Sequence, residues 1–117
     1  MQNINVHEQY QLFQQALGSC GSFLLHCSDK EIAHCLFEEF DSDCVSFLHE
    51  SVLKKLWDEK LISHEVFCLS LKLREKFRAL ENTDAWNVNA VKADLRWKDI
   101  FCLADQIKQF LTGDGKG

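Results

Sequence analysis

Between residues 41 and 80 the apolar side chains recur every three or four residues, and this spacing is the period of an α-helix. They form two runs, which are separated by the short sequence LIS at residues 61–63. Because three residues are enough only for a corner, the spacing predicts two amphipathic helices packed as an antiparallel pair. The two runs are Val45, Leu48, Val52 and Leu56, followed by Val66, Leu69, Leu73, Phe77 and Leu80.

Polar residues in front of each run predict where the two helices begin. Asp41 and Ser42 precede the first run, and Ser63 precedes the second. Their side-chain oxygens are suited to accept hydrogen bonds from the free N–H groups of a first helical turn. Glu65 adds a negative charge to the first turn of the second helix, where the helix dipole favours it.

The N-terminal part of the chain predicts three more helical segments. Apolar spacing over residues 6–17 predicts a first helix, and Gly18 is expected to end it because glycine accepts the left-handed conformation at a helix C-terminus. The sequence Phe-Leu-Leu at residues 23–25 predicts a buried segment that forms a short helix. Ser28 and Glu31 have the spacing of a capping box and predict a helix that continues through EIAHCLFEEF.

The C-terminal part predicts one long helix after a polar connection. Residues 81–95 are mostly polar, and we expect a loop with a short helical turn, anchored by Trp86 and Val88. Residues 97–111 have the most regular helical spacing of the chain. The sequence TGDGKG at residues 112–117 follows this helix and is expected to be a frayed tail.

No proline occurs among the 117 residues, and proline interrupts helices because it lacks a backbone N–H and clashes with the preceding turn. No segment alternates apolar and polar residues as a half-buried strand would. The sequence therefore predicts an all-α, single-domain bundle of about five to seven helices over residues 1–117. No window approaches the roughly 20 apolar residues that span a membrane, and the first residues do not resemble a secretory signal. We therefore expect a cytoplasmic protein without membrane contact.

The six cysteines are expected to be free thiols, because the chain has enough apolar residues to form a core without disulfides. Cys44, Cys68 and Cys102 fall on or beside apolar helix faces, where a thiol packs as a small hydrophobe. The spacings contain no C-x-x-C pair. Histidine and cysteine adjoin at residues 26–27 and 34–35, but neighbours on a helix point about 100° apart. We therefore predict no zinc site, no other metal and no cofactor.

Two pairs of residues could provide a cysteine nucleophile with its base. Cys44 lies near His49, and Cys68 lies four residues after His64, on the same face of one helix. Neither pair is accompanied by a glycine-rich elbow or an oxyanion-hole signature. The favoured interpretation is a packed thiol beside a histidine, so no catalytic residue is predicted and the chain is not expected to be an enzyme.

Charge is distributed unevenly along the chain. Residues 1–59 carry ten acidic and three basic side chains, a net charge of −7, while the remaining residues carry eight acidic and ten basic ones, a net charge of +2. An acidic surface attracts a basic protein partner and disfavours nucleic acid, although an ordinary solvated face is an alternative interpretation. The candidate partner-binding residues, with the tryptophan as an aromatic anchor, are Glu38, Glu39, Asp41, Asp43, Glu50, Trp57 and Asp58.

The chain resembles the small helical immunity proteins of bacterial toxin systems, including the contact-dependent growth inhibition immunity proteins and the MafI-like group. The resemblance lies in FDSDCVSFLHESVLKKLWDEKLISHEVFCLSLKLREKF, where an acidic turn leads into a helix, a short corner and a second helix. The late segment WKDIFCLADQIKQFL completes it. The resemblance implies a cytoplasmic monomer that binds one cognate toxin domain, a basic nuclease, and occludes its active-site cleft.

Three other interpretations are compatible with the sequence. The first is a helical adaptor or regulatory protein that binds an unrelated protein partner. The second is a metal or thiol enzyme, which metal analysis and thiol reactivity would distinguish from inert cysteines. The third is contact of the basic run at residues 72–78 with nucleic acid or an acidic patch, although alternate residues of a helix spread around its circumference and favour a solvated flank.

Overall fold

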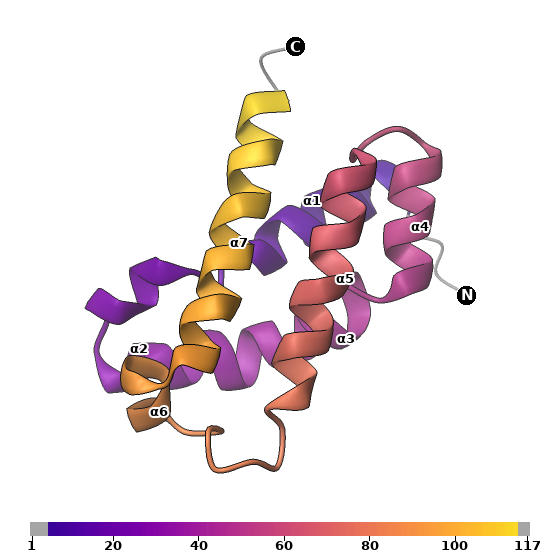
Figure 1. Cartoon of the computed structure of the whole chain (residues 1–117). Coiled ribbons are helices and arrows are strands. Elements are labelled where there is room, and N and C mark those ends of the chain that lie inside the picture. The colour runs from indigo at the N-terminus through magenta and orange to yellow at the C-terminus, as the bar shows by residue number, and fades with distance from the viewer. Residues whose placement is uncertain (1–4, 115–117) are drawn as a thin grey trace.

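The computed structural model describes residues 5–114, and Figure 1 shows helices joined by short turns. Within these residues there is no strand, which confirms the predicted all-α bundle. None of the described helices is long and apolar enough to cross a bilayer. In chain order the helical segments are α1 (Val6–Leu17), the 3₁₀-helix η1 (Ser22–His26), α2 (Asp29–Ile32), the π-helical η2 (Ala33–Phe40), α3 (Asp41–Phe47), α4 (Glu50–Asp58), α5 (His64–Ala79), α6 (Val88–Ala93) and α7 (Leu95–Asp114).

The segments α2, η2 and α3 form one continuous helix, seen crossing the lower part of Figure 1. The backbone stays right-handed helical at both junctions, with φ −60° and ψ −48° at Ile32 and φ −58° and ψ −48° at Asp41. The predicted helix start at Asp41 and Ser42 is therefore wrong. The chain continues because its fully buried side chains recur at steps of four without interruption, which keeps one face in the core. These side chains are Ile32, Leu36, Phe40, Cys44 and Leu48.

The break that the sequence analysis placed before Asp41 occurs instead at Leu48 and His49. Leu48 leaves the helical region with φ −107° and ψ 12°, and His49 is extended. His49 caps α4, because its Nδ1 accepts a hydrogen bond of 3.1 Å from the Ser51 N–H. The sequence predicted one helix that runs through Leu48 and His49, but the structure has two helices there, α3 and α4. Val45 consequently lies on the outer face of α3 and is 50% exposed, although the sequence analysis assigned it to the buried face.

The hairpin of α4 and α5 confirms the predicted antiparallel pair. Lys60 makes the corner with a left-handed φ of 62°. Ser63 caps α5 as predicted, and its hydroxyl oxygen accepts a hydrogen bond of 3.2 Å from the Val66 N–H. Across the hairpin the rings of Trp57 and Phe67 stack with their centroids 4.9 Å apart. This stacking fixes the two helices against each other on their solvent side.

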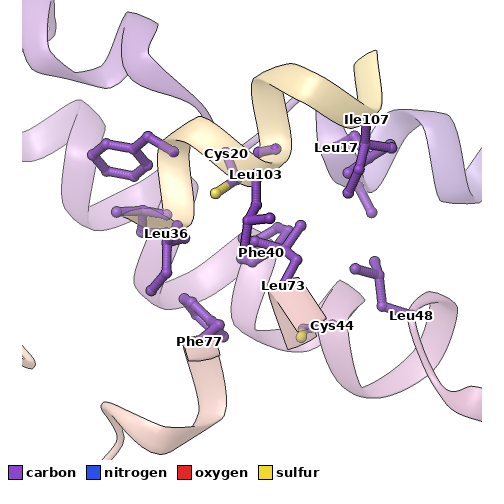
Figure 2. Close-up of a cluster of buried hydrophobic side chains, with 14 of the residues drawn as sticks. Leu17, Cys20, Leu36, Phe40, Cys44, Leu48, Leu73, Phe77, Leu103 and Ile107 are labelled. Atoms are coloured by element: carbon purple, nitrogen blue, oxygen red, sulfur yellow. The ribbon is translucent and has the colours of Figure 1, made fainter. Parts of the chain in front are cut away.

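The core lies where α5 and α7 pack along each other over the continuous α2–η2–α3 helix (Figures 1 and 2). Figure 2 shows side chains from α1, η2, α3, α5 and α7 meeting there, including Leu17, Leu36, Phe40, Phe77 and Ile107.

The helix α7 extends beyond its predicted end at residue 111, so the predicted frayed tail is wrong for residues 112–114. In this last part the Thr112 hydroxyl donates a hydrogen bond of 2.9 Å to the Lys108 carbonyl. Residues 115–117 lie outside the described residues.

Trp97 is the centre of an aromatic cluster at the start of α7. The side chain is completely buried, and its Nε1–H donates a hydrogen bond of 2.7 Å to the carbonyl of Ala85. This bond attaches the loop before α6 to the last helix. Four aromatic rings surround the indole with centroid distances between 5.9 and 6.0 Å, and they belong to Phe37, Phe77, Trp86 and Phe101.

The connection between α1 and η1 requires one glycine. Gly18 ends α1 as predicted, but its φ of −65° is right-handed, so the left-handed conformation expected there is absent. Gly21 has φ 158° and ψ 176°, a region that is essentially restricted to glycine. A Cβ atom on Gly21 would lie 2.7 Å from the Asp105 carboxylate, which accepts a hydrogen bond of 2.6 Å from the hydroxyl of Ser22. Gly21 therefore allows η1 to be attached to α7.

Replacing Gly21 by alanine is expected to lower the free energy of unfolding by about 1–3 kcal/mol, because the backbone must leave its observed conformation or retain it under strain. Urea denaturation followed by circular dichroism measures this change. Gly18→Ala is the matched control, since alanine readily adopts the backbone angles of Gly18. Equal effects of the two substitutions would show that Gly21 is not required by its conformation.

Candidate functional site

A groove of about 570 Å³ lies between η1 and the first part of the α2–η2–α3 helix. We call it the η1–η2 groove. One part of its lining is apolar and partly covered, and the other part consists of exposed charged or titratable side chains. The apolar wall is formed by Phe23, Cys27, Ala33 and Cys35, and the rim by Lys30, Glu31, His34 and Glu38.

Phe23 forms the η1 side of the groove. The sequence analysis assigned it to a buried segment, but the side chain is 41% exposed, while the neighbouring Leu24 is completely buried. The ring also contacts α7, because the Lys108 ammonium lies 5.1 Å from its centroid. Phe23 is therefore an exposed aromatic side chain at a defined position.

The π-helical winding of η2 determines how the acidic rim is arranged. A π-turn closes hydrogen bonds between residues five apart, so a side chain lies close to those both four and five positions later. His34 accordingly contacts two carboxylates, with Nδ1 3.6 Å from Glu38 Oε1 and Nε2 3.4 Å from Glu39 Oε1. In a regular α-helix the residue five positions later would point away from His34. The winding thus directs two carboxylates toward the same side of the helix.

The acidic surface continues from Glu39 along the helix to Asp43, one turn later. Partial burial, with a smaller contribution from the negative charge of Glu39, raises the pKa of the Asp43 carboxyl above its usual range. Glu31, at the other end of the groove, accepts a hydrogen bond of 3.0 Å from the Ser28 N–H, and this capping bond lowers the pKa of its carboxyl.

The structure brings together only some of the candidate residues predicted from the sequence. Glu38, Glu39, Asp41 and Asp43 lie on one continuous helix, and of these Glu38 lines the η1–η2 groove while Asp41 is half-buried. The remaining three are on α4, where Glu50 occupies the first turn and Asp58 the last, about 12 Å further along the axis. Asp58 is 3.5 Å from the ammonium of Lys54, and Trp57 is half-buried in the hairpin; they are therefore partly engaged within the chain.

The residues that turn the acidic surface into a groove were not predicted from the sequence. His34 was considered only as a zinc ligand, and Phe23 as a core residue. The one available signal was the spacing of Glu38 and Glu39 at four and five positions after His34, which becomes meaningful only once the helix is known to be π-wound.

The cysteines are free thiols in different environments. Cys20 and Cys44 are completely buried, and burial raises the pKa of the Cys44 thiol to about 12. Cys68 and Cys102 are exposed, so the prediction that they pack as small hydrophobes is wrong for these two. In the described part of the chain no group of three or more His, Cys, Asp or Glu side chains is arranged to hold a metal ion.

No protein-family model, curated protein or solved structure matches the chain.

Proposed function

We propose that the chain is an immunity protein that binds a cognate toxin domain and blocks its basic active-site cleft. The observation that carries the proposal is the η1–η2 groove, whose apolar wall is bordered by carboxylates that continue along the helix. The resemblance of the sequence to small helical immunity proteins supplies the class of partner. A nuclease is the proposed toxin, because its cleft is basic in order to hold phosphates.

The groove has the chemistry to receive a long basic side chain from such a partner. The methylene stem of a lysine or arginine packs against apolar surface while its charged end stays with polar groups. Here the stem would lie against Phe23 and Ala33, and the charged end would meet Glu38. Carboxylates around a pocket also accelerate encounter with a basic protein and disfavour other partners. In this proposal they take the place of substrate phosphates in the toxin cleft.

The proposal is tested by calorimetry with the C-terminal domain encoded by the gene immediately upstream, used as a catalytically inactive variant. We expect tight binding with one-to-one stoichiometry. We also expect the protein, when it is present in the cytoplasm, to protect cells that express the active domain. Circular dichroism confirms that the protein used is helical. If the folded protein neither binds this domain nor protects the cells, the immunity function is wrong, and the adaptor interpretation takes its place.

A further inference from the structure

A histidine and a cysteine on the first two turns of α5 lie within coordination distance of a common ion. His64 Nε2 and Cys68 Sγ are 3.5 Å apart, and both side chains are exposed. The two residues are four positions apart, so they project from the same face of the helix. The sequence analysis noted this spacing and interpreted Cys68 as a packed thiol, whereas its exposure makes the sulfur accessible from solvent.

The imidazole of His64 is held in position by the α4–α5 hairpin. Its ring centroid lies 4.7 Å from that of Trp57, and the indole in turn stacks on Phe67 at 4.9 Å. A ligand whose orientation is fixed before binding loses less conformational freedom when the ion arrives. The aromatic contacts therefore prepare Nε2 for an ion that approaches on the side of Cys68.

We propose that His64 and Cys68 form a two-ligand chelate site for a thiophilic divalent cation, zinc in the first place. Zinc binds cysteine sulfur at about 2.3 Å and histidine nitrogen at about 2.0–2.1 Å, and a tetrahedral angle between them separates sulfur from nitrogen by about 3.5 Å. The observed separation of 3.5 Å equals this value. On binding, the Cys68 thiol releases its proton to solvent and the thiolate donates an electron pair to the ion, without any change in oxidation state.

Two coordination positions of the ion are left for ligands from outside the chain. The described residues contain no third His, Cys, Asp or Glu side chain placed to complete the site. The site is therefore open, as zinc sites that bind exchangeable ligands are, and its affinity is expected to be lower than that of a closed four-ligand site. It uses the α4–α5 hairpin and none of the groove residues, so its test does not depend on the groove that supports the proposed immunity function.

Cobalt(II) is the probe for this site, because a cobalt–thiolate bond absorbs in the near ultraviolet and free cobalt does not. The reduced wild-type protein is titrated with cobalt chloride, and zinc chloride is then added to displace the cobalt. We expect the charge-transfer band of one thiolate, saturation at one ion per chain, and loss of the band upon zinc addition. Absence of the band, or a band that zinc does not remove, would overturn the proposal.

Three variants locate the site. Cys68→Ser is expected to remove the band, and His64→Ala to weaken cobalt binding at least about tenfold through loss of one of two ligands. Cys102→Ser is the matched control, because Cys102 is also exposed but has no histidine contact among the described residues, and it is expected to titrate as the wild type does. A band that persists in Cys68→Ser, or one that is lost in Cys102→Ser, contradicts the assignment. Both altered ligands are exposed, so circular dichroism is expected to show folded variants.

Discussion

Replacing Trp97 by alanine is expected to lower the free energy of unfolding by about 3–5 kcal/mol, the usual cost of removing a buried tryptophan. The side chain is completely buried, and the cavity would open among the rings of Phe37, Phe77 and Trp86. The substitution also removes the Trp97 hydrogen bond to the Ala85 carbonyl, but this carbonyl keeps a second hydrogen bond of 2.9 Å from the Asn87 N–H, so lost packing accounts for most of the change. Because domains of this size have about 5–15 kcal/mol of stability, the variant would be near the limit of folding.

Urea denaturation followed by circular dichroism measures the effect, and two controls separate its causes. Trp97→Phe retains a ring but not the N–H, so the difference between it and alanine reports on packing. Leu95→Ala changes a residue that is 71% exposed in the first turn of the same helix, and it is expected to alter stability by less than about 0.5 kcal/mol. If Trp97→Ala were no more destabilising than Leu95→Ala, the aromatic cluster would not be part of the stable core.

Reversing two charges beside the η1–η2 groove is expected to weaken binding of the proposed toxin domain at least about tenfold at low salt, which corresponds to about 1.4 kcal/mol. The variant is Glu38→Lys combined with Glu39→Lys. Each substitution replaces attraction to a basic cleft by repulsion, and like charges facing each other across an interface cost several kcal/mol. Stability is expected to change little, because both carboxylates are exposed and their contacts with His34 lie on the surface.

The matched control is Glu75→Lys combined with Asp99→Lys, which changes the net charge by the same amount. Both residues are exposed and lie on α5 and α7, away from the groove lining. Calorimetry at two salt concentrations compares the variants, and the difference between them should shrink as salt screens exposed charges. Equal affinities of the two double variants would mean that net charge, and not this surface, attracts the partner.

Local signals in the sequence predicted the helices whose ends are formed by local hydrogen bonds. Ser28 with Glu31, and Ser63, cap helices in the structure as their spacing indicates. The apolar spacing of α7 likewise predicted its buried face, including Trp97 and Ile107. In each case the side chains that decide the outcome lie within one or two turns of one another, so the sequence alone contains the necessary information.

The boundaries that failed depend on contacts between distant segments. Asp41 and Ser42 are good capping residues, but the buried stripe through Phe40 and Cys44 keeps the helix intact across them. His49 is not among the residues most favoured as a helix cap, yet it caps α4, since the continuous helix ends at Leu48. Local preference was outweighed at both points by the requirement to keep apolar residues in the core.

The sequence predicted the negative charge of the candidate site, but it did not predict the groove. The acidic character around Glu38, Glu39 and Asp43 follows directly from the distribution of charged residues along the sequence. The groove beside them requires Phe23, whose exposure depends on how η1 is attached to α7 through Asp105 and Lys108. That attachment joins residues 83 positions apart in the chain, which no local pattern indicates.

The π-helical segment has a consequence for how this surface can change during evolution. Buried residues at steps of four would drift around a regular α-helix, and the wider turns of η2 compensate for this drift. A π-turn holds one residue more than an α-turn, so deleting one residue within η2 would let the segment rewind as an α-helix while the residues after it kept nearly the same direction. The surface that carries Asp43 could thus keep its direction through a one-residue deletion in η2, a change that in a regular α-helix would turn it by about 100°.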